Sequence, residues 1–137
     1  MLSKKPKKLS RSKIVKKLDA VFSQYIRLKY ADDLGNVSCF TCDKKAYWHA
    51  DGMQCGHFMS RKNYSTRWEI LNCMPQCVSC NVYNYGRQFI FSKKLDEKFG
   101  EGTAEDLYIK SKQILKFSTD ELNDKIKHFK QLVDKMK

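Results

Sequence analysis

The chain has 137 residues and a net charge of +12, and its 42% hydrophobic and 31% charged residues are typical of a folded domain rather than a disordered segment. This length allows one compact domain with extensions but not two full domains. No apolar run approaches the roughly 18 residues that span a bilayer, and no apolar core follows the lysines of residues 1–8 as in a secretory signal, so we expect a cytoplasmic protein without membrane contact.

The N-terminal part of the chain is strongly basic and leads into a predicted helix. Residues 1–17 carry eight lysines or arginines and no acid. We predict a flexible tail over residues 1–11, which either binds phosphates or only keeps the chain in solution. From Ser12 the apolar residues recur at helical spacing, so an N-terminal helical segment is predicted over residues 12–34.

Two Cys-x-x-Cys pairs mark the middle of the chain. They are Cys39, Cys42, Cys77 and Cys80, with 34 residues between the pairs. Each pair lets two thiolates converge on one tetrahedral ion, so together they predict a zinc site with four sulfur ligands. Such a closed site is structural, because it leaves no position for a substrate. The alternatives are redox-active dithiols or cysteines buried in the core, and burial is also our interpretation of Cys55 and Cys73.

The segment 37–87 around these cysteines is predicted to form a small ββα-metal module. We expect Met53–Met59 and Trp68–Cys73 to pair as two strands, connected by the basic stretch Ser60–Arg67. A helix that starts near Cys80 and extends to about residue 89 completes the module. The predicted fold class is therefore α+β and mostly helical, with a treble-clef-like zinc module between N-terminal and C-terminal helices.

Three polar residues of this module are candidates for catalysis. His57 is predicted at the end of a strand, Asn72 precedes the second cysteine pair, and Asn81 directly follows it. A neutral imidazole can activate water for phosphodiester hydrolysis, and an amide oxygen is a hard ligand that suits Mg²⁺. Asn72 is expected to bond across the hairpin and to fix the strand that carries His57. The alternative is a structural role for each residue, such as a core histidine or a helix cap.

Positive charge is concentrated around the cysteines. Between Arg61 and Lys94, six basic residues accompany the single acid Glu69. The candidates for contacts with DNA phosphates are Arg61, Lys62, Arg67 and Arg87. Planar guanidinium groups can bind two phosphate oxygens at once, so Arg61 and Arg67 are expected to clamp a DNA backbone. The alternative is a solvated basic loop.

Residues 88–137 are predicted to form a C-terminal helical extension. Two segments, Thr103–Asp106 and Ser118–Glu121, fit helix-capping arrangements in which a hydroxyl binds the backbone and an acid three residues later complements the helix start. Apolar residues follow the second cap at helical spacing from Leu122 to Met136. This stripe fits either packing onto the core or a homodimer interface.

The cysteine pairs and the residues between them resemble the lambda NinG (Rap) recombination-protein family. They are also similar to the wider HNH, or His-Me finger, endonucleases, which include phage endonuclease VII. The matching motifs cover about residues 37–87 closely and are Cys39-x-x-Cys42, Gly56-His57-Phe58-Met59-Ser60-Arg61, Thr66-Arg67-Trp68-Glu69, Asn72 and Gln76-Cys77-x-x-Cys80-Asn81.

This resemblance implies a phage-encoded endonuclease that uses Mg²⁺ or Mn²⁺ to cut branched recombination intermediates, such as D-loops and Holliday junctions, in the host cell cytoplasm. It implies structural zinc in the four cysteines, His57 as general base and Asn81 as a ligand of the catalytic metal. Many HNH enzymes carry an aspartate where this chain has Gly56, which leaves Glu69 and Asp51 as candidates for the second metal ligand. Branched DNA is the expected partner, and a junction with two cleavage points favours a homodimer. The alternative function is a non-catalytic zinc module that binds nucleic acid or a protein.

Overall fold

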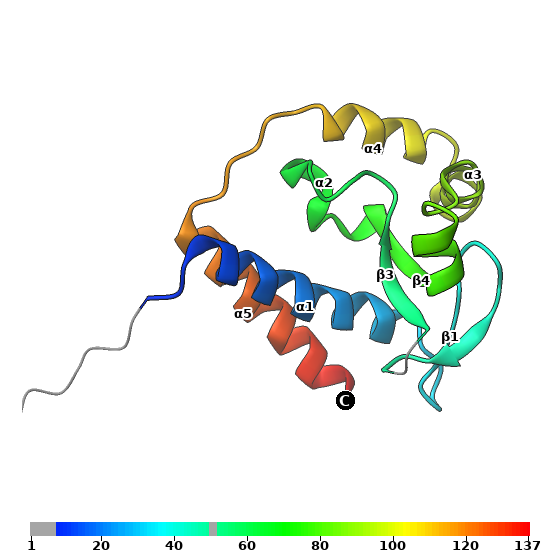
Figure 1. Ribbon diagram of the computed structural model, residues 1–137, viewed down its shortest axis with the longest axis horizontal. Coiled ribbons are helices and arrows are strands. Elements are labelled where there is room, and N and C mark those ends of the chain that lie inside the picture. The colour runs from blue at the N-terminus through cyan, green and yellow to red at the C-terminus, as the bar shows by residue number, and fades with distance from the viewer. Residues whose placement is uncertain (1–7, 50–51) are drawn as a thin grey trace, which may run out of the picture.

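The computed structural model describes residues 8–49 and 52–137. The predicted mixed α+β class is confirmed, because the chain is mostly helical and contains two small antiparallel sheets (Figure 1). In chain order the elements are α1 (Arg11–Lys29), β1 (Asn36–Ser38), β2 (Lys45–Tyr47), β3 (Met53–His57), α2 (Tyr64–Arg67), the 3₁₀ turn η1 (Ile70–Asn72), β4 (Cys73–Cys77), the π-helical turn η2 (Ser79–Tyr83), α3 (Gln88–Phe99), α4 (Thr103–Ser111) and α5 (Thr119–Met136). Most of the predicted basic tail, residues 1–7, lies outside the described residues. None of the described helices is long and apolar enough to cross a membrane.

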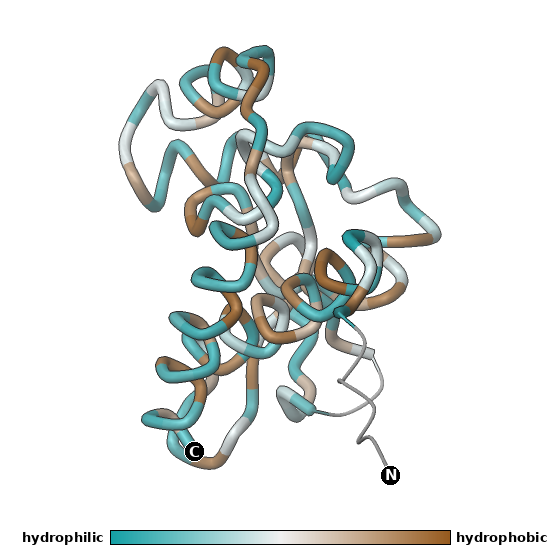
Figure 2. Tube along the Cα trace, turned by 90° about the vertical axis from the view of Figure 1, so that its left-hand side faces the viewer, coloured by the Kyte–Doolittle hydropathy of each residue, from teal (hydrophilic) through white to brown (hydrophobic). Residues whose placement is uncertain are grey.

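Helices α1 and α5 lie side by side and enclose the largest hydrophobic core (Figure 1). The helical spacing of apolar residues explains this packing, and the colours along α5 alternate between hydrophobic and hydrophilic residues (Figure 2). Phe22 of α1 meets Phe129 of α5 edge to face, with ring centroids 5.0 Å apart. Met136, predicted as the end of the stripe, is 41% exposed, so the buried stripe ends at Val133.

The two predicted capping arrangements have different outcomes. Ser118 and Glu121 form the predicted capping box, because each side chain accepts a hydrogen bond from the other residue's backbone N–H. The hydroxyl cap predicted at Thr103 was wrong, because Thr103 is already the first residue of α4, whereas the predicted acid Asp106 does lie in the first turn. The N–H of Ala104 donates instead to Asp96 Oδ1, 2.9 Å away in α3. A carboxylate from the preceding helix therefore caps α4.

The β3–β4 hairpin lies between the two helical groups, with α1 on one side and α3 and α4 on the other (Figure 1). Its antiparallel register pairs Met53 with Cys77 and His57 with Cys73. The hairpin therefore carries the second cysteine pair at one end and the candidate base at the other. This arrangement places both candidate sites on one rigid element.

The second strand of this hairpin was predicted at Trp68–Cys73, and that placement was wrong. After β3 the chain first forms the helical turns α2 and η1, and it pairs with β3 only from the end of that prediction onward. The fully buried Asn72 explains the difference. Its Oδ1 accepts from Met59 N, and its Nδ2 donates to the carbonyls of Met59 and Thr66. These bonds satisfy backbone groups inside a folded connection, so this segment does not extend as a strand.

The helix predicted from Cys80 to about residue 89 was wrong in part. The turn η2 is followed by a break, and α3 begins only at Gln88. Tyr85, Gly86 and Arg87 have positive φ angles of 54°, 83° and 50°. Successive left-handed residues cannot continue a right-handed helix. The break turns the chain from the cysteine-rich region into the second core, where α3 and α4 pack against the hairpin.

Candidate functional site

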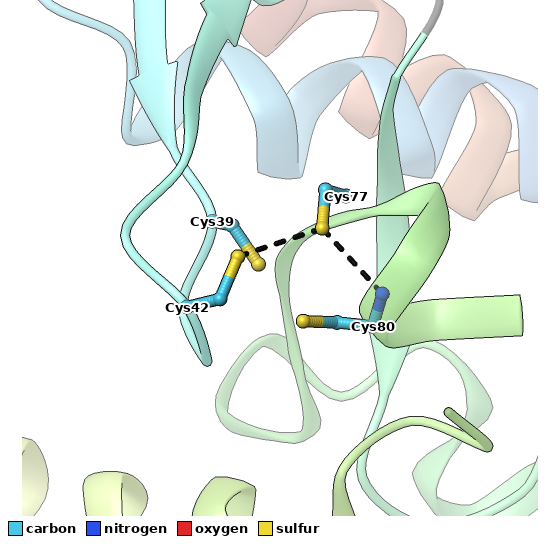
Figure 3. Close-up of side chains that lie close together, drawn as sticks. All are labelled: Cys39, Cys42, Cys77 and Cys80. Carbon is cyan, nitrogen blue, oxygen red and sulfur yellow. Dashed lines mark hydrogen bonds between the residues drawn. The ribbon is translucent and has the colours of Figure 1, made fainter. Parts of the chain in front are cut away.

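Four cysteine sulfurs converge between the two small sheets. Cys39 and Cys42 come from the turn between β1 and β2, whereas Cys77 ends β4 and Cys80 lies in η2 (Figure 3). Their Sγ atoms all lie within 4.8 Å of one another, and those of Cys42 and Cys77 are 3.6 Å apart. Zn–S bonds of about 2.3 Å in a tetrahedron separate the sulfurs by about 3.8 Å. The cluster is therefore consistent with the predicted structural zinc.

Backbone hydrogen bonds shape the turn that carries the first pair. Cys39 N donates to Lys44 O at 2.7 Å, and Asp43, between them, has a φ of 64° that closes the turn. Phe40 N donates to Pro75 O at 2.8 Å, which fastens the turn to β4 and brings the two cysteine pairs together. Hydrogen bonds within the turn and to β4 therefore hold the first cysteine pair next to the second pair.

The surroundings of the sulfurs favour a bound cation. Burial opposes ionisation of Cys39, but hydrogen bonds from the backbone of Cys77 and from Thr41 outweigh it and lower the Cys39 pKa to about 6. Burial raises the pKa of Cys77, because a buried thiolate loses its hydration and is stable only with a compensating charge. A divalent ion would supply that charge, which is consistent with four thiols gathered in one small space.

A cavity of about 590 Å³ opens between α1, β3 and η2, and one of its lining residues, Asn81, directly follows Cys80 of the four-cysteine centre. Its lining residues are Asp19, Ser23, Gln54, Cys55, His57, Arg61, Asn81 and Val82. The cavity thus brings together three of the predicted site residues, namely His57, Arg61 and Asn81. A larger cavity of about 680 Å³ near Tyr30 and Lys94 has no histidine among its described lining residues, so we place the chemistry in the smaller one.

His57 stands at the end of β3, where the chain fixes both the position and the charge of its ring. One ring nitrogen, Nε2, lies 2.9 Å from Arg67 O, so Nε2–H donates to this carbonyl and Nδ1 keeps its lone pair. Burial lowers the pKa of His57 below its usual value of about 6.5. The hydrogen bond to the carbonyl of Arg67 raises the pKa by less than burial lowers it, and the positive charge of Arg61 adds a smaller lowering. The imidazole is therefore neutral at neutral pH, as a general base must be.

Asn72 and Asn81 occupy different places relative to the cavity. Asn72 is buried and binds the backbone of Met59 and Thr66, so it holds the connection that follows His57 and does not line the cavity. Asn81 lines the cavity, and its Nδ2 donates to Gln54 Oε1 at 2.8 Å. That bond orients the amide and leaves Oδ1, a hard oxygen donor, as the free end of the side chain within the described part of the chain.

The four basic residues predicted to contact DNA lie in different places relative to the cavity. Arg61 lines the cavity, whereas Lys62 and Arg87 are exposed outside its lining. Arg67 is held in place, because its Nε and Nη2 donate to the two oxygens of Asp19 at 3.1 and 2.6 Å and its Nη1 donates to Arg61 O at 2.9 Å. Asp19 raises the pKa of Arg67. The role of Arg67 in the structure is to connect α1 to the cavity wall.

Asp19 was missed by sequence reasoning, although it is the one acid among the described residues that line the cavity. Besides the ion pair with Arg67, it accepts a 2.9 Å hydrogen bond from Trp68 Nε1. It therefore positions the backbone whose carbonyl binds His57. The signal was present, because Asp19 is the only acid in α1 and lies next to the buried Leu18.

Only one of the two acids proposed as second metal ligands falls within the described residues, and it does not line this cavity. Glu69 Oε2 pairs with Lys110 Nζ at 2.7 Å and is not among the lining residues. Asp51 lies outside the described residues. The carboxylate that does line the cavity, Asp19, has both oxygens engaged by Arg67 and Trp68.

Gly56, which precedes the candidate base, is fixed by packing. It pairs with Met74 in the hairpin, and a Cβ at this position would overlap the buried side chain of Gln76. Gln76 Nε2 donates to Thr41 Oγ1 at 3.1 Å and to Gly86 O at 2.9 Å, so the amide cannot move without losing both bonds. An aspartate at Gly56 does not fit this hairpin.

We expect Gly56→Ala to lower the free energy of unfolding by about 1–3 kcal/mol, as overpacking of a well-filled interior does. Urea denaturation of the variant measures the change. A double-mutant cycle with Gln76→Ala provides the control, because removal of the Gln76 side chain should relieve the overlap. Strictly additive effects of the two substitutions would contradict this explanation of Gly56.

The two remaining cysteines differ in burial. Cys73 is fully buried, as predicted, at the start of β4. The predicted burial of Cys55 was wrong, because this residue is partly exposed and lines the cavity beside His57. Cys55 and His57 both line the cavity, because residues two apart on a strand lie on the same face of it.

Comparison with known proteins gives one result. The family model described as the bacteriophage lambda NinG protein matches residues 2–137 of the chain. Neither the comparison with curated proteins nor the comparison with solved structures gave a match. The family match covers the four cysteines, the cavity and the helices on both sides.

Proposed function

The chain belongs to the bacteriophage lambda NinG family, and from this membership and the site geometry we propose that it is a Mg²⁺-dependent DNA endonuclease of the HNH type that cuts branched DNA. The observation that carries the proposal is the cavity in which His57, Arg61 and Asn81 meet beside the four-cysteine centre. We place the catalytic module at residues 37–87, with the helical segments 12–34 and 88–137 packed around it.

The residues of the cavity divide the work of phosphodiester hydrolysis. His57, neutral and anchored through Nε2, takes a proton from the attacking water at Nδ1. Arg61 stabilises negative charge on the phosphate. Asn81 offers an amide oxygen to Mg²⁺, an ion that usually keeps several waters and takes few protein ligands. When bound there, Mg²⁺ would neutralise charge on the phosphate and on the leaving oxygen.

An exposed aromatic surface next to the cavity supports branched DNA as the substrate. Val82 lines the cavity, and the residues that follow it include Tyr83, Tyr85 and Phe89, which are 75%, 89% and 72% exposed. The Lys93 ammonium lies 4.6 Å from the centroid of the Phe89 ring. Aromatic rings interleaved with basic groups stack on unpaired bases and hold the backbone, and such bases occur where DNA strands branch.

The second candidate function is a non-catalytic zinc module that binds nucleic acid. The observation that favours it concerns Gly56, which stands where an acidic metal ligand is common in HNH enzymes. The side chain of Gln76 occupies the space that a larger residue at this position would need. In that case the cavity would bind phosphate without hydrolysis. The two functions predict the same binding but different products.

Cleavage of a labelled four-way junction tests the proposal against linear duplex of the same length. We expect cleavage of the junction in Mg²⁺, little cleavage of the duplex, and none with EDTA. Binding measured in EDTA at increasing salt should weaken steeply, because phosphate contacts release counterions. A protein that binds the junction but leaves it intact in both Mg²⁺ and Mn²⁺ is the non-catalytic module.

A further inference from the structure

A second group of metal-binding side chains lies at the opposite end of the hairpin from the four-cysteine centre. It consists of Cys55, His57 and Cys73, whose ligand atoms all lie within 4.8 Å of one another. The register explains the cluster: His57 is paired with Cys73, and Cys55 stands two residues before His57 on the same face of β3. Two thiols and an imidazole are therefore held on adjacent strands.

We propose that Cys55, His57 and Cys73 form a second site for a thiophilic divalent cation such as Zn²⁺. The donor set is soft, so it suits Zn²⁺ and not the Mg²⁺ proposed for catalysis. Tetrahedral coordination places two sulfurs about 3.8 Å apart, so shifts of about 1 Å would bring the three groups around one ion. Binding of the ion releases the two thiol protons.

The site is open on one side, unlike the four-cysteine centre. Cys55 and His57 line the cavity, whereas Cys73 lies fully buried behind them. Three protein ligands would leave the fourth position of the ion facing the cavity. Three ligands with an open position are typical of zinc that exchanges or binds a further ligand, whereas four sulfurs are typical of permanent structural zinc.

The charges around the cluster fit an ion held by two thiolates. Two thiolates and a neutral imidazole neutralise a divalent ion, so the occupied site adds no net charge next to Arg61. Arg27 and Arg61 place positive charge near Cys55 and His57, respectively, and the occupied site would add none to it. The cationic surroundings therefore do not oppose the bound ion.

An ion at this site would occupy the histidine that the proposed reaction uses as its base. Zinc at the second site should therefore inhibit cleavage, while zinc at the four-cysteine centre supports the fold. The binding of the second ion is independent of the proposed function, whereas the inhibition rests on it. The two parts can be tested separately.

Metal stoichiometry tests the binding. Full-length protein kept under a reductant is titrated with Zn²⁺, and with Co²⁺ to follow the thiolate-to-cobalt absorption band. We expect two zinc equivalents for the wild type and one for Cys55→Ser and Cys73→Ser, with a second cobalt band absent from both variants. His128→Ala changes an exposed histidine on α5 and should keep two equivalents.

Circular dichroism confirms that each variant is folded, and the half-exposed Cys55 is the more tolerant position. Saturation of the wild type at one equivalent, or a second equivalent retained by Cys55→Ser, would overturn the site. In the cleavage assay, each protein is compared with its own rate before Zn²⁺ is added. The wild type should lose most of its rate as the second equivalent binds, and Cys55→Ser should not. Two equivalents without any cleavage would refute the proposed function and leave the site standing.

Discussion

Replacement of Cys77 by serine should remove zinc from the four-cysteine centre and unfold most of the chain. Cys77 is buried at the end of β4 and contacts both cysteine pairs, through Cys42 Sγ at 3.6 Å and the N–H of Cys80 at 3.5 Å. Zinc binding contributes about 10–16 kcal/mol in small zinc modules, whereas whole domains are stable by only about 5–15 kcal/mol. If the loss of one ligand releases the zinc, the lost binding free energy is as large as the whole free energy of unfolding of a domain, so the fold is lost as well.

Zinc content measured by mass spectrometry and thermal unfolding followed by circular dichroism give the result. The measurement is made in a Cys55→Ser background, so that an ion at the second cluster does not add to the count. Ser38→Ala, an exposed change directly before the first cysteine, is the matched control and should keep its zinc and its melting temperature. A full zinc equivalent in Cys77→Ser would refute the four-cysteine ligand set.

The four-cysteine cluster could be predicted from the sequence because its signal is local. Each Cys-x-x-Cys turn is a short motif, and the residues that shape it, such as Asp43 at φ 64°, lie within the same few positions. The α1 and α5 stripes were likewise predictable, because helical periodicity needs no knowledge of the partner. These features depend on neighbours along the chain.

The strand register and the cavity wall depended on contacts between distant residues. Asn72 looks like a polar end to a strand, but in the structure its amide binds Met59 and Thr66 and keeps the connection helical. Asp19 lies 48 positions before Arg67, and no spacing rule links them. The structural role of a buried polar group depends on its hydrogen-bond partners, and sequence periodicity does not identify those partners.

These misplacements have one physical consequence for the site. With the strand at Cys73–Cys77, Cys55 and His57 share the cavity, and Gly56 faces Gln76. The glycine that marks the departure from common HNH enzymes is thus part of the hairpin's packing. The acid among the described residues that line the cavity is Asp19, which is linked to His57 through the side chain and the carbonyl of Arg67.

Replacement of His57 by alanine should lower the rate of junction cleavage by about 10²–10⁴-fold, the usual contribution of a general base. Binding of the junction in EDTA should change little, because His57 is neutral and carries no phosphate contact that depends on charge. His128→Ala, on the exposed side of α5, is the matched control and should cleave at the wild-type rate.

The pH dependence of wild-type cleavage tests the same base through its charge. Burial lowers the His57 pKa, so the folded protein holds the neutral, basic form at a lower pH than an exposed histidine does. The rate should therefore rise with pH, with a midpoint below about 6.5, and reach its plateau before neutral pH. A midpoint well above that value, or an unchanged rate in His57→Ala, would show that another group activates the water. Because Asp19 holds Arg67, and Arg67 O binds Nε2, Asp19→Asn should move this midpoint even if it leaves the fold intact.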